Sequence, residues 1–225
     1  MLMTETKFAG AEALIFDLDG TLIDSKLDLV ISVNATLAKL GREALPEATV
    51  ASYVGSGAGV LMQRALGGSP SEEQLKHALN LFLEHYSAHK LDNTRTYPGV
   101  ETALAQLQDF PMAVLTNKPV RASMEILAGL GLARYFKKIY GGNSFDTKKP
   151  DPLGANTILI ELDVAPGRAV MVGDSEVDVQ TARNTGMLAA IVEYGFGTHN
   201  RAAYPADVYL TRMEDLVPLV MNGNR

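Results

Sequence analysis

The chain has 225 residues, of which 47% are hydrophobic, enough for one large domain or for one domain that carries a smaller one. Its formal net charge is -6 and no Lys/Arg cluster stands out, which argues against nucleic acid as a partner. It has no cysteines, which excludes disulfides, thiolate metal sites and thiol catalysis. Its polar start and the absence of an apolar run of ~20 residues predict neither a signal peptide nor a membrane partner. We therefore expect a cytoplasmic protein.

Short apolar runs rich in Val, Ile and Ala recur along the chain and predict buried strands. They lie at 13–16, 112–115, 169–172, 189–192 and 208–210. Segments with helical spacing separate the later runs, at 100–108, 121–131, 151–162 and 176–186. This alternation predicts an α/β fold with a Rossmann-like parallel sheet that is covered by helices on both faces.

The region between the first two strands breaks this rhythm. It contains helix-like segments at 26–41, 60–68 and 72–90 and no convincing strand, which indicates an inserted all-helical domain. We predict an α/β core from residues 1–21 plus 96–225 and a helical domain over 22–95. The glycine-rich run at 55–59 lies inside the helical region with no strand before it, which favours a helix junction over a dinucleotide-binding loop.

Polar and charged side chains follow the predicted strands. Ligands of open α/β sheets bind at the carboxyl ends of the strands, so these side chains are expected to meet at one edge of the sheet. Several carboxylates, a hydroxyl and a lysine at one place suit Mg²⁺, which takes oxygen ligands, and phosphoryl transfer. The side chains are Asp17, Asp19, Thr116, Asn117, Lys118, Lys149, Asp174 and Asp178.

Four short motifs in this set resemble the haloacid dehalogenase superfamily. They are the DxDGT run at 17–21, the strand-end Thr116, Lys149 directly before a proline, and the GDxxxD run at 173–178. Each motif is short, but their order and their places on the predicted elements agree with the family from Asp17 to about Gly186. A calcium loop does not fit the first motif, because a strand precedes it and its glycine is in the fourth position.

The resemblance implies a role for each aspartate. Asp17 would be the nucleophile that forms an aspartyl-phosphate, and Asp19 would be the general acid and base. The ligands of Mg²⁺ would be Asp17, the backbone carbonyl of Asp19, and Asp174. Asp178 would orient metal-bound water or the lysine from a second shell of contacts.

The resemblance also implies a phosphate site. Thr116 and the backbone of Asn117 would hold phosphate oxygens. Lys149 would bridge the phosphate and the carboxylates, because the family places this lysine directly before proline, whereas Lys148 would be a solvated neighbour. Glycines at 195 and 197 suggest a mobile loop close to the metal site.

The second aspartate of the DxDGT run, Asp19, limits the type of reaction that the resemblance implies. Family dehalogenases and phosphonate hydrolases lack it, so Asp19 indicates hydrolysis of a phosphate monoester or transfer of phosphate between the hydroxyls of a sugar. Segments of both the core and the insertion, among them "YVGSGAGVLMQRAL", "LTNKP" and "VGDSEVDVQTARNTG", are similar to phosphoglycolate phosphatases. This similarity implies 2-phosphoglycolate as substrate. Arg64 is the candidate partner of its carboxylate and Lys118 a further candidate contact, with an ordinary surface charge as the alternative for each.

Several alternatives stay open. Other members of the family act on sugar phosphates, nucleotides or pyrophosphate or are phosphomutases, and the motifs do not separate these substrates. A non-catalytic phosphate-sensing protein is a more distant alternative, since such a protein would be expected to lack Asp17 or Asp19. A monomer and a homodimer would have the same periodicities, so both agree with the sequence.

Overall fold

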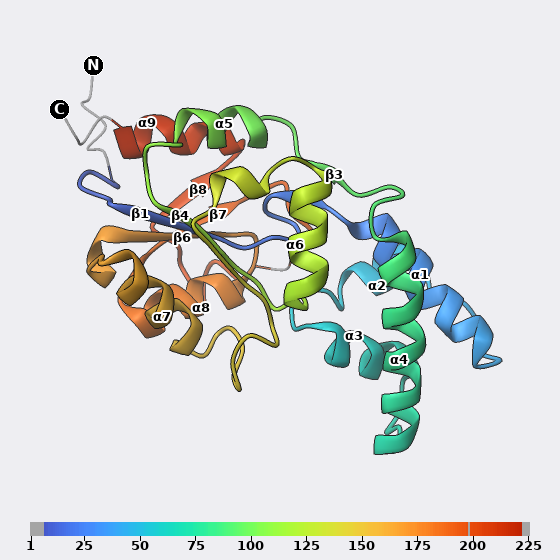
Figure 1. Cartoon of the computed structure of the whole chain (residues 1–225). Coiled ribbons are helices and arrows are strands. Elements are labelled where there is room, and N and C mark those ends of the chain that lie inside the picture. The colour runs from blue at the N-terminus through green and yellow to red at the C-terminus, as the bar shows by residue number, and fades with distance from the viewer. Residues whose placement is uncertain (1–6, 198, 222–225) are drawn as a thin grey trace.

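The computed structural model in Figure 1 describes residues 7–197 and 199–221. Its centre is a six-stranded sheet in the order β5-β4-β1-β6-β7-β8, in which every neighbouring pair is parallel. The chain runs outward from β1 in one direction and then returns to run outward in the other, as in doubly wound folds. The strands are β1 (Ala13–Phe16), β4 (Met112–Leu115), β5 (Lys138–Tyr140), β6 (Ala169–Gly173), β7 (Leu188–Val192) and β8 (Val208–Leu210).

Helices cover both faces of this sheet. Figure 1 shows α5 (Val100–Gln106), α6 (Val120–Gly129) and α9 (Leu216–Met221) on one face. The other face carries α7 (Leu153–Leu162) and α8 (Glu176–Thr185). Short 3₁₀ turns lie at η1 (Ala133–Tyr135), η2 (Pro166–Arg168) and η3 (Met213–Asp215).

The strands read as uniform apolar runs because both of their faces are buried. In β1, Leu14 and Phe16 pack into the larger hydrophobic cluster, and Ala13 and Ile15 pack into the smaller one beside α7 and α8. All four side chains are buried. The predicted Rossmann-like parallel sheet is thus confirmed.

Four helices lie between residues 25 and 94, beside the carboxyl edge of the sheet (Figure 1). They are α1 (Lys26–Lys39), α2 (Glu47–Ala51), α3 (Ala58–Leu66) and α4 (Glu72–His89), and we call residues 25–94 the helical segment. Within it, α4 packs against both α1 and α3. Serine 71 caps α4 in a reciprocal arrangement with Gln74, which satisfies two backbone donors at the start of the helix.

Two short strands join the helical segment to the sheet. In β2 (Ile23–Asp24) and β3 (Arg95–Thr96) the chain leaves and returns as an antiparallel pair. Beside this pair the buried Asp28 carboxylate accepts hydrogen bonds from the backbone N–H and side chain of both Asn93 and Thr94, at 2.7 to 3.1 Å. Asp28 therefore fastens the start of α1 to the chain that leaves α4.

The sequence missed the shortest elements. It did not predict β5, an edge strand whose residues are only half buried, or the five-residue helix α2. Nor did it predict β2 and β3, which have two residues each. Among the described residues, no helix is both long and apolar enough to cross a membrane.

Candidate active site

The first strand delivers Asp17 and Asp19 to the carboxyl edge of the sheet. Between the strand and β2 the chain turns sharply, and Gly20 N donates to Ile23 O at 2.9 Å. Gly20 has φ +82°, and a Cβ at this position would lie 2.0 Å from Asp174 Oδ2. Only glycine suits this turn, because its backbone is left-handed and because the Asp174 carboxylate occupies the space of a side chain.

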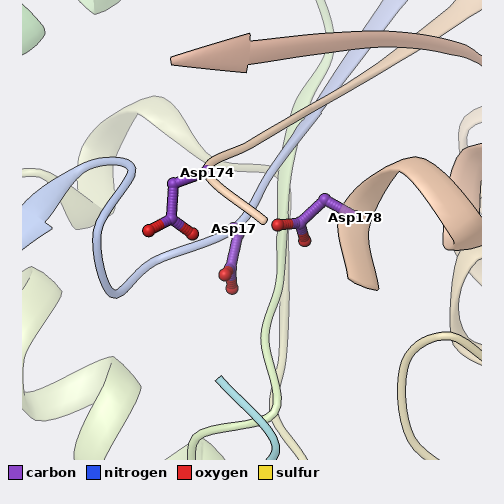
Figure 2. A group of neighbouring side chains, drawn as sticks. All are labelled: Asp17, Asp174 and Asp178. Atoms are coloured by element: carbon purple, nitrogen blue, oxygen red, sulfur yellow. The ribbon is translucent and has the colours of Figure 1, made fainter. Parts of the chain in front are cut away.

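Three carboxylates converge at this edge, as Figure 2 shows. Asp17 follows β1, Asp174 follows β6 and Asp178 lies in the first turn of α8. One oxygen of each lies within 4.8 Å of the others, and all three residues are buried. Like charges this close repel one another and raise pKa values unless a cation lies between them.

Lys149 supplies part of that compensation. Its ammonium lies 2.9 Å from Asp17 Oδ1 and 2.6 Å from Asp178 Oδ1. Burial opposes the charge on Lys149, but the two carboxylates outweigh it and raise the pKa of the lysine. Burial raises the pKa of Asp17 to about 6, with repulsion from Asp178 in the same direction and attraction by Lys149 opposed.

The site fits a hard divalent cation. When ionised, the three carboxylates exceed the charge of Lys149 by two negative charges, and their oxygens are the ligand type that Mg²⁺ prefers. Asp17 Oδ1 is buried, and apart from its ion pair with Lys149 it has no partner among the described residues, which leaves it able to bind a metal. Asp178 differs, because Lys149 contacts one of its oxygens and the backbone and side chain of Ser175 donate to the other.

Asp174 is covered by the loop that follows β7, which the sequence analysis placed only near the metal site. Gly197 N donates to Asp174 Oδ2 at 2.7 Å, and the Tyr194 hydroxyl donates to Thr21 O at 2.9 Å. Burial and repulsion by Asp178 and Asp17 raise the pKa of Asp174 well above its usual range. The loop after β7 thus contacts the metal-ligating candidate directly.

Asp19 has a separate set of partners. Lys118 Nζ lies 2.9 Å from Asp19 Oδ1 and 3.0 Å from Oδ2, and the hydroxyl of Ser25 donates to Oδ1 at 2.5 Å. The same ammonium lies 4.6 Å from the ring centre of Tyr86, a buried residue of α4. Burial opposes the charge of Lys118, but Asp19 and Tyr86 outweigh it and raise the pKa of the lysine.

Thr116 and Asn117 follow β4 and lie beside these groups. Both are buried, and Lys118 N donates to Thr116 Oγ1 at 3.2 Å. Asn117 Nδ2 donates to Lys149 O at 3.1 Å and to Gly55 O at 3.0 Å. The glycine-rich run predicted as a helix junction does precede α3, whose N-cap is Gly57, but it also contacts the core through Gly55.

A cavity of about 50 Å³ separates the sheet edge from the helical segment. Its core wall includes Asp17, Asp19, Thr116, Asn117 and Lys118, so the structure brings these predicted site residues together. Arg64 is exposed on α3 and is not among the residues that line the cavity. The sequence missed the opposite wall, which is formed by Leu29, Val54, Gly55, Gly57, Ala58, Leu61, Phe82, Leu83 and Tyr86.

The fold, the three converging carboxylates and the two buried lysines that form ion pairs with carboxylates agree with the family motifs in the sequence. The chain belongs to the haloacid dehalogenase-like hydrolase family, whose model matches residues 14–192. It is therefore an enzyme of a hydrolase class.

Individual relatives point in one direction. The chain is 37% identical to a phosphoglycolate phosphatase of Psychrobacter arcticus, with 88% of this chain and 91% of the relative covered. It is 39% identical to a phosphoglycolate phosphatase of Vibrio cholerae over 80% of this chain and 84% of the relative. A crystal structure described as a predicted phosphoglycolate phosphatase from Haemophilus somnus superposes with a TM-score of 0.89 at 28% identity, covering 94% of this chain and 99% of that one.

Proposed function

We propose that this protein is a Mg²⁺-dependent phosphate monoester hydrolase that acts on 2-phosphoglycolate through an aspartyl-phosphate on Asp17. The observation that carries the proposal is the position of Asp17, buried at the end of β1 between Lys149 and the cavity. A carboxylate so placed can attack phosphorus, and the names of the relatives above support phosphoglycolate as the substrate.

The core residues divide the work on the phosphate. Asp17 attacks the phosphorus atom, the P–O bond to the leaving group breaks, and the aspartyl-phosphate forms. Lys149 and the Thr116 hydroxyl bind phosphate oxygens and offset the repulsion between the phosphate and Asp17. Asp178 positions Lys149 through their 2.6 Å contact, and Ser175 in turn positions Asp178.

Asp17, Asp174 and the backbone carbonyl of Asp19 would hold Mg²⁺. When bound, the cation lowers the repulsion among the carboxylates and stabilises the charge that develops on the transferring phosphoryl group. The Asp174 carboxylate is kept in place by Gly197 N and by the close approach of Gly20.

Asp19 would act as the general acid and base. It donates a proton to the departing alkoxide and afterwards accepts one from the water that hydrolyses the aspartyl-phosphate. Its carboxylate lines the cavity and is held by Lys118 and Ser25, so it faces the place that a leaving group would occupy.

The helical segment would be the cap of the site. Its residues close one side of the cavity with mostly apolar side chains, which exclude water from the aspartyl-phosphate and limit the size of the leaving group. On this proposal the cap runs over 22–95 and the core over 1–21 plus 96–225.

The first experiment is phosphate release from 2-phosphoglycolate, sugar phosphates, nucleotides and pyrophosphate, with and without Mg²⁺ and with Asp17→Asn as the blank. A Mg²⁺-dependent preference for 2-phosphoglycolate is expected. Preference for another member of the panel would refute the substrate, and release that Asp17→Asn retains would refute the mechanism. Hydroxylamine, which converts an acyl phosphate to a hydroxamate, should label Asp17 during turnover, as peptide mass spectrometry would detect.

A further inference from the structure

The wall of the cavity carries one positively charged side chain among the described residues. Among the described residues that form its wall, Lys118 is the sole lysine or arginine, and its side chain is 4% exposed. The walls that the helical segment contributes carry mostly apolar side chains, among them Leu29, Leu61 and Phe82. A buried ammonium in such surroundings is costly unless an anion compensates it; Asp19 supplies one, and a negatively charged ligand would add to it.

The donors of Lys118 are not exhausted by Asp19. An ammonium has three N–H groups, and the two oxygens of Asp19 account for two of them at 2.9 and 3.0 Å. In the part of the chain that the structure describes, Asp19 supplies the only oxygens that accept from Lys118 Nζ with hydrogen-bond geometry, although the Tyr86 hydroxyl lies near enough to help raise the pKa of the lysine. One donor at the cavity wall is therefore available to a ligand.

Tyr86 offers a second donor at the same wall. Its hydroxyl oxygen is buried and has no hydrogen-bond partner among the described residues, although its ring lies against Lys118 and stacks on Phe82 at 5.6 Å. Burial raises the pKa of Tyr86 to about 12, so the hydroxyl keeps its proton. An unpartnered buried hydroxyl is costly in an empty cavity and is satisfied when a ligand accepts from it.

We propose that Lys118 Nζ and Tyr86 Oη form a subsite for a carboxylate on the leaving group. This inference rests on the proposed function and extends it, because it makes the preferred substrates phosphate monoesters of small hydroxy acids. A cavity of about 50 Å³ has room for about three to five waters, which restricts the leaving group to a few heavy atoms. A sugar would be too large for this space.

The test compares kcat/KM for 2-phosphoglycolate with that for its amide, in which a neutral group of similar size replaces the carboxylate. The intact protein should prefer the carboxylate by about 10-fold or more, as charge-assisted hydrogen bonds do. Lys118→Met should remove most of this preference, and Lys118→Arg should restore part of it. Tyr86→Phe, which deletes one oxygen that has no partner, should keep the fold and lower the preference by about 3-fold.

The ratio between the two substrates separates this role from a structural one. Loss of the contact between Lys118 and Asp19 lowers turnover of both substrates together and cancels in the ratio. Lys76→Met, on an exposed face of α4, is the matched control and should leave the ratio unchanged.

Two failures are distinguishable. If the intact protein prefers the carboxylate and both Lys118→Met and Tyr86→Phe retain that preference, the subsite is refuted and the proposed function stands. If the intact protein hydrolyses sugar phosphates or pyrophosphate in preference to 2-phosphoglycolate, the proposed function fails and the subsite fails with it.

Discussion

The two buried lysines of the site are held by different parts of the chain. Lys149 contacts Asp17, directly after β1, and Asp178, in the first turn of α8, so both of its carboxylate partners belong to the sheet and its helices. Lys118 contacts Asp19 on one side and the ring of Tyr86 from α4 on the other. On the proposed function, this difference would assign the phosphate to the core and the leaving group to the core and the helical segment together.

Removal of Asp17 should have the largest effect, because both sides of this comparison depend on it. Asp17→Asn keeps the size of the side chain but removes the nucleophile, so kcat should fall by about 1,000-fold or more on every substrate. Phosphate release measures the loss, and circular dichroism checks that the fold is retained. Turnover within 10-fold of the intact protein would exclude Asp17 as the nucleophile.

Lys149→Met should impair phosphate binding and leave the recognition of the leaving group unchanged. The variant removes the ammonium that contacts Asp17 and Asp178, and kcat/KM should fall by about 100-fold. Because Lys149 does not line the cavity wall, the fall should be equal for 2-phosphoglycolate and its amide, in contrast to Lys118→Met. A selective loss of the carboxylate substrate would contradict the division between the two lysines.

Gly20→Ala tests whether the close approach of Gly20 to the Asp174 carboxylate is needed for metal binding. The added methyl group would lie 2.0 Å from Asp174 Oδ2 at a residue with φ +82°, so the turn or the carboxylate must move. The Mg²⁺ concentration for half-maximal activity should rise by about 10-fold or more. Gly41→Ala is the matched control for backbone strain, because Gly41 also has positive φ but has no atom within 4 Å of the added group. An equal effect of both would show that strain, rather than Asp174, is responsible.

Asp28→Ala should weaken the attachment of the helical segment. It leaves the backbone and side-chain donors of Asn93 and Thr94 without their acceptor, which should cost about 2–4 kcal/mol of the free energy of unfolding. Thermal and urea denaturation measure this change. A loss below about 0.5 kcal/mol would mean that water replaces the carboxylate.

Asp28 also predicts a dependence of stability on pH. Burial opposes its charge, but the hydrogen bonds from Thr94 and Asn93 outweigh it and lower the pKa below the ordinary value of 3.8. The folded chain therefore binds this proton less tightly than the unfolded chain, so the stabilisation is present above pH 3.8 and is lost as pH falls through the folded pKa. Between pH 5 and about pH 2, Asp28→Asn should lose less stability than the intact protein. An equal loss in both would contradict this assignment.

Arg64→Ala should have the smallest effect. Its side chain is exposed and lies outside the cavity lining, so kcat/KM for 2-phosphoglycolate should stay within about 2-fold of the intact protein. A loss of 10-fold or more, with the amide substrate unaffected, would favour Arg64 over Lys118 as the partner of the carboxylate.

The core could be predicted from sequence because its signals are local. Strands β1, β4, β6 and β7 are buried on both faces, which turns each into an unbroken apolar run. The half-buried β5 carries Lys138 and Tyr140 instead, so no such run marks it. Asp17, Asp19, Asp174 and Asp178 belong to two short motifs. The convergence of Asp17, Asp174 and Asp178 follows from the meeting of strand ends at one edge.

The part of the site proposed for the leaving group could not be predicted in the same way, because its contacts join residues that are distant in the chain. Tyr86 belongs to a helix whose spacing reads only as amphipathic, and nothing local shows that its ring meets Lys118. Gly55 reads as part of a junction between helices, although its carbonyl also accepts from Asn117. The sequence favoured Arg64 as the cation that meets the carboxylate and named Lys118 only as a further contact, because the packing of α3 and α4, which leaves Arg64 exposed, is not legible in the sequence.

The antiparallel pairing of β2 with β3 bears on how the insert between them could be exchanged. Paired residues such as Ile23 and Thr96 are neighbours across a ladder, so the entire helical segment is topologically the loop of a β-hairpin. The ends of a hairpin loop stay adjacent whatever its length, and lengthening it adds little to the entropy of closure. A different insert could therefore replace residues 25–94 while the register of the parallel sheet stays unchanged, which makes this hairpin a natural point for exchanging specificities.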